Sequence, residues 1–145
     1  IGRRYGNRGD PALHKYVANH DLDDHVHLLG AVPDEALSAL YGGALCLVFP
    51  SRHEGFGLAP IEAMTAGTPV IAARVGALPA TLGDAALWLE EPDSISELAG
   101  LMGRVVREPA LRQDLRQRGF DQSSQYSLRH LAEQTLTVYR KLLER

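Results

Sequence analysis

Cysteine is almost absent from the sequence, because Cys46 is the single one among 145 residues. A disulfide framework within the chain and a zinc site built from cysteines are therefore excluded. Cys46 lies within the apolar run 44–49, so we expect its thiol to be buried. Long apolar runs are missing too, since none approaches the roughly 18 residues of a membrane span, and no signal-peptide pattern opens the chain. A soluble protein in the reducing cytoplasm is the expectation.

An excess of positive charge is also lacking, since 15 Lys and Arg stand against 18 Asp and Glu, for a net charge of −3. A general nucleic-acid binder usually carries a basic excess, so we expect no nucleic-acid partner. With 45% hydrophobic and 23% charged residues, the composition is that of a globular protein rather than a disordered, collagen-like or rod-like one. We expect residues 1–145 to form one domain, and Ile1 in place of methionine indicates a piece of something longer.

Short apolar runs and helical periodicity alternate through the first two thirds of the chain. The runs that predict strands are His25–Leu29, Ala44–Phe49, Pro69–Ala73 and Ala86–Leu89. The run 44–49 is apolar without alternation, as expected when helices cover both faces of a parallel sheet. Helices are predicted over 34–41 and 57–66, each followed by glycine. The alternation predicts an α/β fold, a Rossmann-like parallel sheet with helices on both faces.

The last third of the sequence predicts helices alone. Ser94 and Glu97 form a capping-box signature at the start of the first of these helices. Pro109 predicts the start of a second helix and Gly119 its end. An apolar stripe at helical spacing predicts a long terminal helix from Ser127.

The segment 49–64 carries the most specific functional pattern. A buried strand is predicted to end at Phe49, a loop follows, and a helix begins near Gly57. Ligands of open α/β sheets bind outside the carboxyl ends of the strands, and the free amides at a helix start attract phosphate. Gly55 and Gly57 have no side chains, so the backbone there can approach a ligand closely.

Two carboxylates flank this helix start, Glu54 in the loop and Glu62 about one and a half turns into the helix. A carboxylate would repel a phosphate that it touched, whereas it accepts hydrogen bonds from hydroxyl groups. Hydroxyl groups on both sides of a phosphate describe a nucleotide sugar, with its sugar, diphosphate and ribose. Ordinary roles stay open for each residue taken singly, because Glu62 could favour the helix dipole and Glu54 could be a solvated loop residue.

The sequence Glu54-Gly-Phe-Gly-Leu58, then Glu62-Ala-Met64 and Gly67-Thr-Pro-Val-Ile-Ala72, resembles the group-1 retaining glycosyltransferases of GT-B fold. Two glutamates with seven residues between them are that family's signature. The resemblance extends from His27 to Leu143 and covers nearly the whole chain. It implies that residues 1–145 are the C-terminal, nucleotide-sugar-binding half of a GT-B fold, without its first strand region and its N-terminal acceptor domain.

The resemblance also implies roles at matching positions. Glu54 would be catalytic and bind hydroxyl groups of the donor sugar, while Glu62 would hold the ribose. Ala31 and Val32 would lie beside the base. The positions that it implies for the sugar, the diphosphate and the pocket wall are Gly55, Phe56, Gly57, Leu58, Ser51 and Thr68.

Enzymes of this family transfer the sugar with retained configuration and without a metal, because helix amides and cationic side chains stabilise the departing diphosphate. The resemblance therefore implies no cofactor and no metal, a GDP- or UDP-sugar donor, and a saccharide or lipid-linked acceptor. The run 47–58 is similar to mannosyltransferases that build surface polysaccharide, which implies GDP-mannose. The family's arginine and lysine that contact the diphosphate belong to a segment before Ile1, and Ala80 stands where many relatives carry glutamate. Any contact with the inner face of a membrane would come from the part outside this chain.

Two other functions remain open from the sequence. A non-catalytic nucleotide-sugar-binding or regulatory domain would have the same fold. A hydrolase would need Glu54 and Glu62 to face each other across a bond at roughly 5–10 Å. Binding of a nucleoside diphosphate alone separates these functions from one another, because a simple hydrolase would not require it. His25 and His27 have no fitting third ligand for a metal site.

Overall fold

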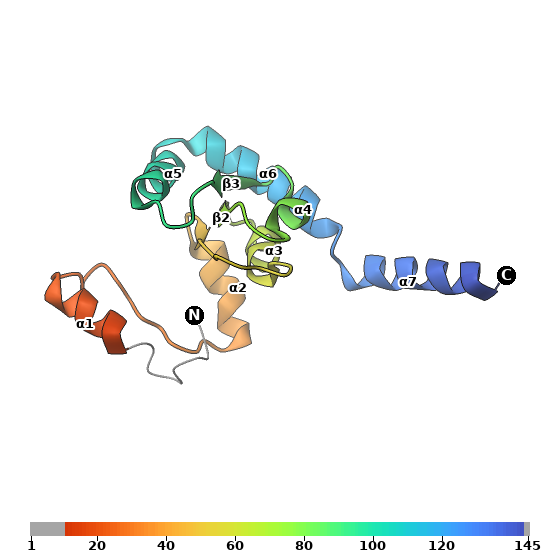
Figure 1. Ribbon diagram of the computed structural model, residues 1–145, viewed down its shortest axis with the longest axis horizontal. Coiled ribbons are helices and arrows are strands. Elements are labelled where there is room, and N and C mark those ends of the chain that lie inside the picture. The colour runs from red at the N-terminus through yellow and green to blue at the C-terminus, as the bar shows by residue number, and fades with distance from the viewer. Residues whose placement is uncertain (1–10, 144–145) are drawn as a thin grey trace. The chain divides into compact units, whose positions relative to one another are not determined.

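The computed structural model describes residues 11–143 (Figure 1). The chain forms two compact units, which divide between Leu37 and Ser38. The first unit contains α1 (Pro11–Asn19), in which Val17 is buried, and the beginning of α2 (Asp34–Gly43). Within it the Tyr16 ring stacks on His20, with the centroids 4.1 Å apart.

The strand predicted over His25–Leu29 is wrong, because these residues form turn and irregular backbone instead. The amides of His25 and Val26 both donate to the Leu22 carbonyl, at 2.9 and 2.8 Å, which closes a turn rather than a ladder. A parallel strand requires a neighbouring strand for its hydrogen bonds. Within residues 11–143, no segment pairs with 25–29.

The second unit is built on a parallel sheet with the strand order β1-β2-β3. Its elements after α2 are β1 (Leu47–Phe49), α3 (Leu58–Thr65), β2 (Val70–Ala73), α4 (Leu78–Leu82), β3 (Ala86–Leu89), α5 (Ile95–Arg107), α6 (Pro109–Ser124) and α7 (Leu128–Leu143). All four residues of β2 are buried. Because successive side chains of a strand point to opposite faces, both faces of the sheet are covered at β2. The predicted α/β, Rossmann-like parallel sheet is confirmed.

The core of this unit lies where α3 packs against the sheet and against α6. Met64 and Leu78 are fully buried there. The prediction that α6 ends at Gly119 is wrong, because the helix continues to Ser124. A Cβ atom at Gly119 would lie 3.2 Å from Cγ of Met64. The glycine thus allows α6 to approach α3 closely and does not terminate the helix.

The capping box at the start of α5 is confirmed in part. The amide of Glu97 donates to the Ser94 hydroxyl at 3.3 Å. The Glu97 carboxylate turns to the preceding segment, where it accepts hydrogen bonds from the amides of Glu90 at 2.9 Å and Glu91 at 3.1 Å. One acidic side chain therefore orders the whole connection between β3 and α5.

The terminal helix α7 carries the predicted apolar stripe, and that stripe is exposed. Its exposed large apolar side chains are Leu131, Leu136, Val138, Tyr139, Leu142 and Leu143. No helix within residues 11–143 combines the length and the apolar character that crossing a membrane requires. Cys46 is half-buried rather than buried, and this burial raises the pKa of its thiol.

Candidate functional site

The loop of residues 51–57 joins β1 to α3 at the carboxyl edge of the sheet. It is called the donor loop below, after the role that the family resemblance implies for it. The amide of Ala77, which follows β2, donates to the Glu54 carbonyl at 3.0 Å. Gly76 permits this contact, because its φ is +54° and a Cβ atom there would collide with the same carbonyl oxygen. The donor loop is therefore held by the segment that leaves the neighbouring strand.

Gly57 ends the donor loop and caps α3 with a left-handed backbone, at φ 95° and ψ 54°. A Cβ atom here would lie 2.5 Å from Cδ2 of Leu78, so an L-residue would be strained and would also clash. No side chain caps the start of α3. The first-turn amides and the positive end of the helix dipole are consequently available to an anionic group.

Glu54 is half-buried, and its carboxylate turns back onto the donor loop. Its Oε1 atom accepts hydrogen bonds from the amides of Gly55 at 3.2 Å and Phe56 at 3.4 Å. The first distance is at the upper end of the usual range for an N–H···O bond and the second exceeds it, so these bonds are weak. A carboxylate thus lies on the same amides that the family resemblance assigns to the sugar and the diphosphate.

Glu62 is exposed on α3, and its carboxylate interacts with the Tyr41 side chain of α2. Burial and then the charge of Glu62 raise the pKa of Tyr41 above its ordinary value of 10.0. The Tyr41 carbonyl in turn accepts from the Thr68 hydroxyl at 2.5 Å. Tyr41 is therefore a neighbour placed to orient Glu62, and sequence reasoning missed it. The available signal was a hydroxyl-bearing aromatic side chain in the last turn of the helix before the motif.

The first residues of the donor loop form two polar contacts, one within the loop and one to Asp93. The Ser51 hydroxyl donates to the His53 carbonyl at 2.8 Å. Arg52 forms an ion pair with Asp93, at 2.8 Å, with side chains 78% and 73% exposed. Exposed pairs of this kind contribute only about 0–1 kcal/mol. The contact is therefore one that an anionic ligand could replace at little cost.

A second cation, Arg74, lies at the same edge, directly after β2. It pairs with Glu90 at 2.8 Å, and its guanidinium lies 4.6 Å from the centre of the Trp88 ring. Sequence reasoning missed both Arg52 and Arg74. The signal that could have found them is their position, since each closely follows the end of a strand.

Three predicted site residues lie outside the donor loop in the sequence, namely Thr68, Ala31 and Val32. Thr68 precedes β2, and Leu47 of β1 pairs with Val70, so Thr68 lies at the amino edge of a parallel sheet. Its buried hydroxyl donates to the Tyr41 carbonyl, and its place near the pocket wall stays a prediction. Ala31 and Val32 belong to the first unit, and their place beside the base stays a prediction.

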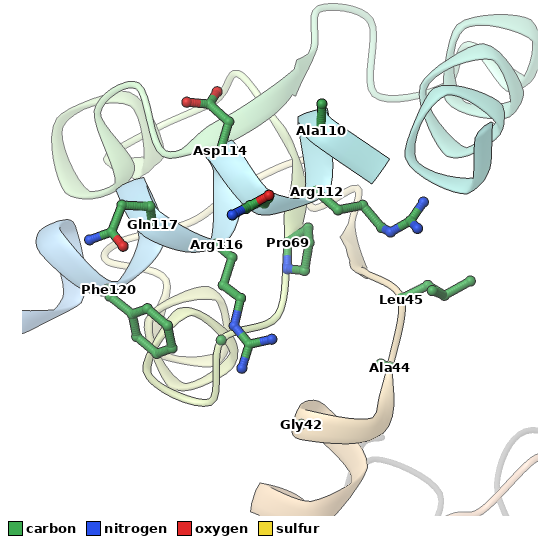
Figure 2. Close-up of a pocket in the computed structure, with 12 residues that line it drawn as sticks. Gly42, Ala44, Leu45, Pro69, Ala110, Arg112, Asp114, Arg116, Gln117 and Phe120 are labelled. Carbon is green, nitrogen blue, oxygen red and sulfur yellow. The ribbon is translucent and has the colours of Figure 1, made fainter. Parts of the chain in front are cut away.

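A hollow of about 860 Å³ lies at the amino edge, between α6 and the segments around Gly42 and Gly67 (Figure 2). Its charged side chains are already engaged by the protein. Arg112 donates to the Val105 and Val106 carbonyls at 2.6 and 2.9 Å. The Arg116 guanidinium lies against Gly67 and 5.6 Å from the Phe120 ring. This hollow is separate from the predicted site.

Metal-ligating side chains are not clustered in the part of the chain that the structure describes. No group of three or more His, Cys, Asp or Glu residues is placed there to hold an ion.

Curated proteins similar to this chain include two mannosyltransferases. The chain is 34% identical over 139 residues to "O-antigen chain mannosyltransferase B" of Escherichia coli, a match that covers 94% of this chain and 36% of that protein. It is 35% identical over 134 residues to "MMP alpha-(1->4)-mannosyltransferase" of Mycolicibacterium hassiacum, covering 90% and 33%. The chain thus spans about a third of the length of these relatives.

Solved structures with the same fold include a sucrose-phosphate synthase from Thermosynechococcus elongatus. That match has a TM-score of 0.81 at 32% identity and covers 91% of this chain and 34% of the other. The C-terminal domain of a group 1 family glycosyl transferase from Francisella tularensis matches with a TM-score of 0.70 at 27% identity, covering 81% and 62%. The sequence pattern of the family described as "Glycosyl transferases group 1" matches residues 5–122. The chain therefore belongs to the group 1 glycosyl transferases.

Proposed function

We propose that the chain is the donor-binding domain of a retaining glycosyltransferase, and that the donor loop and the start of α3 bind a nucleotide diphosphate sugar. One arrangement carries this proposal. The amides of Gly55 and Phe56 already hold a carboxylate, and they stand beside the uncapped start of α3 at Gly57. Backbone amides and the positive end of a helix dipole at one place favour the binding of an anionic group. A diphosphate is such a group.

The two glutamates would bind the groups on either side of the diphosphate, the ribose and the transferred sugar. Glu62, oriented by Tyr41, would accept hydrogen bonds from the ribose hydroxyls. Glu54 would leave the Gly55 and Phe56 amides and accept from hydroxyls of the transferred sugar. Those amides would then be free to donate to phosphate oxygens. Their fixed dipoles would stabilise the charge that develops on the diphosphate as the bond to the sugar breaks.

We further propose mannose as the sugar and GDP as the nucleotide, because two similar proteins are named as mannosyltransferases. The acceptor would be a saccharide or a lipid-linked saccharide. The acceptor would be held by a second, N-terminal Rossmann-like domain. The exposed apolar stripe of α7 supports such a partner domain, since a patch of this kind marks a surface that packs against protein.

The direct test is calorimetric titration of GDP, UDP and GDP-mannose into the full-length protein, together with a sugar-transfer assay. The proposal expects one nucleoside diphosphate to bind without its sugar and the matching donor to be turned over. Binding without transfer to any saccharide acceptor would support a non-catalytic nucleotide-sugar-binding domain instead. Failure of all nucleoside diphosphates to bind would overturn the proposal.

A further inference from the structure

Phe56 is the one residue with a side chain between the two glycines of the donor loop, Gly55 and Gly57. Its ring is 39% exposed and meets the ring of Tyr126 edge to face, with centroids 5.4 Å apart and planes at 86°. Glycine on both sides gives the backbone more conformational freedom than other residues would. The aromatic contact therefore restrains this part of the donor loop, together with the hydrogen bonds from the Gly55 and Phe56 amides to the Glu54 carboxylate.

Tyr126 is itself a firmly held partner. It follows α6 in a turn closed by its amide, which donates to the Ser123 carbonyl at 3.0 Å. The last turns of α6 are fixed to the rest of the unit, because the Gln122 side chain donates to the Thr81 carbonyl at 2.7 Å and Gly119 packs on Met64. A ring on such a support can restrain the donor loop through its contact with the Phe56 ring.

We propose that Tyr126 is a positioning residue that sets the orientation of the Gly55 and Phe56 amides through the Phe56 ring. Its effect on donor binding rests on the function proposed above, whereas its effect on the loop does not. Tyr126 contacts Phe56 through its ring, so the hydroxyl group is not required. A hollow of about 450 Å³ beside Tyr126 leaves part of its ring unpacked, and truncation there should leave the core intact.

The test compares Tyr126→Ala with Tyr126→Phe in the 145-residue chain, by NMR relaxation of the backbone amides of the donor loop. Order parameters of a rigid backbone are about 0.85 and those of a flexible one fall below about 0.6. We expect the alanine variant to lower the values at Gly55, Phe56 and Gly57 toward the flexible range. The phenylalanine variant keeps the ring and should keep the wild-type values. Tyr16→Ala is the matched control, because it removes another exposed tyrosine from a ring pair, the one with His20.

Titration of GDP into the same variants gives the second measurement. An edge-to-face ring contact corresponds to about 2- to 10-fold in an equilibrium. We expect GDP affinity to fall by about that factor in Tyr126→Ala and to be restored in Tyr126→Phe. Loss of loop order with unchanged GDP affinity would support the positioning role and overturn the donor loop as the nucleotide site.

Unchanged order parameters in Tyr126→Ala would overturn the positioning role, and so would an equal loss of order in Tyr126→Phe. Phe56→Leu removes the same contact from the loop side and gives the answer even if Tyr126→Ala does not fold. Combining it with Tyr126→Ala should add little to either single change, because the two rings act as one contact. Additive effects would show that Tyr126 acts on the loop by another route and would refute the proposal.

Discussion

Replacing the two glutamates one at a time should separate the two ends of the donor. Glu62→Ala should weaken GDP and GDP-mannose to the same extent, because the ribose is present in both. A hydrogen bond between a charged group and a hydroxyl contributes about 1.5–3 kcal/mol, which is roughly 10- to 100-fold in affinity. The Glu62 carboxylate also interacts with the Tyr41 side chain, which is present in both complexes and does not alter the equal effect on the two ligands.

Glu54→Ala should have a different pattern. In the structure its carboxylate occupies the amides of Gly55 and Phe56 through bonds of 3.2 and 3.4 Å. Removing it frees these amides, so GDP affinity should be unchanged or rise by about 2- to 3-fold, the effect of losing weak competing bonds. GDP-mannose should lose about 10-fold or more, because its sugar hydroxyls lose a charged acceptor. Turnover of the full-length protein should fall with it.

Isothermal titration of GDP and of GDP-mannose into the wild-type protein and both variants measures this difference in affinity. Asp121→Ala is the matched control, since it removes an exposed carboxylate on α6 that accepts from Gln117, and it should change neither affinity. The melting temperatures should also stay close to wild type, as substitutions of surface carboxylates usually change stability by less than about 0.5 kcal/mol. Equal and small effects of Glu54→Ala and Glu62→Ala on both ligands would refute the assignment and make them ordinary loop and helix residues.

Other predictions concern stability, the metal and the tyrosine behind Glu62. Gly57→Ala should destabilise the fold by about 2–4 kcal/mol in chemical denaturation, because alanine would be strained in the left-handed backbone and would clash with Leu78. Gly55→Ala is the matched control, since the space around its Cβ position is open, and it should lower the free energy of unfolding by less than about 1 kcal/mol. A chelator should leave nucleotide binding unchanged, whereas loss of binding that magnesium restores would contradict the metal-independent proposal. Tyr41→Phe should lower GDP affinity about 3- to 10-fold, because it removes the donor that orients Glu62. The raised pKa of Tyr41 stabilises the fold below pH 10.0, and this contribution should disappear as the pH rises above that value and be absent in Tyr41→Phe.

Much of the second unit follows from local sequence alone. The strand at Ala86–Leu89 has the predicted bounds, and the apolar runs before it contain β1 and β2. These runs extend beyond the strands at their amino ends, because a strand begins only where a neighbour supplies hydrogen bonds. The loop between β1 and α3 could be placed from Gly55, Gly57 and the adjoining apolar run. Periodicity, glycine and capping residues act within a few positions, so they can be read without knowing what surrounds them.

Long-range packing decided the features that local patterns misplaced. His25–Leu29 has the composition of a strand, but a parallel strand exists only with a partner, and the described residues supply none. Gly119 has the sequence signature of a helix end, yet it serves the contact between α6 and Met64. In both cases the local sequence is compatible with two structures. Residues that are distant in the sequence but close in the fold decide which of the two forms.

The same distinction between local sequence and tertiary packing applies to the candidate site. The sequence by itself determined that Glu54, the glycines and Glu62 lie around one strand-loop-helix junction, because these residues are close along the chain. Only the tertiary structure decided that the Glu54 carboxylate lies on the amides of its own loop, that Tyr41 interacts with Glu62 and that Tyr126 meets Phe56. Tyr41 and Tyr126 are separated from their partners by 21 and 70 residues of sequence. Contacts at such separations form when distant elements pack together, and no local pattern specifies them.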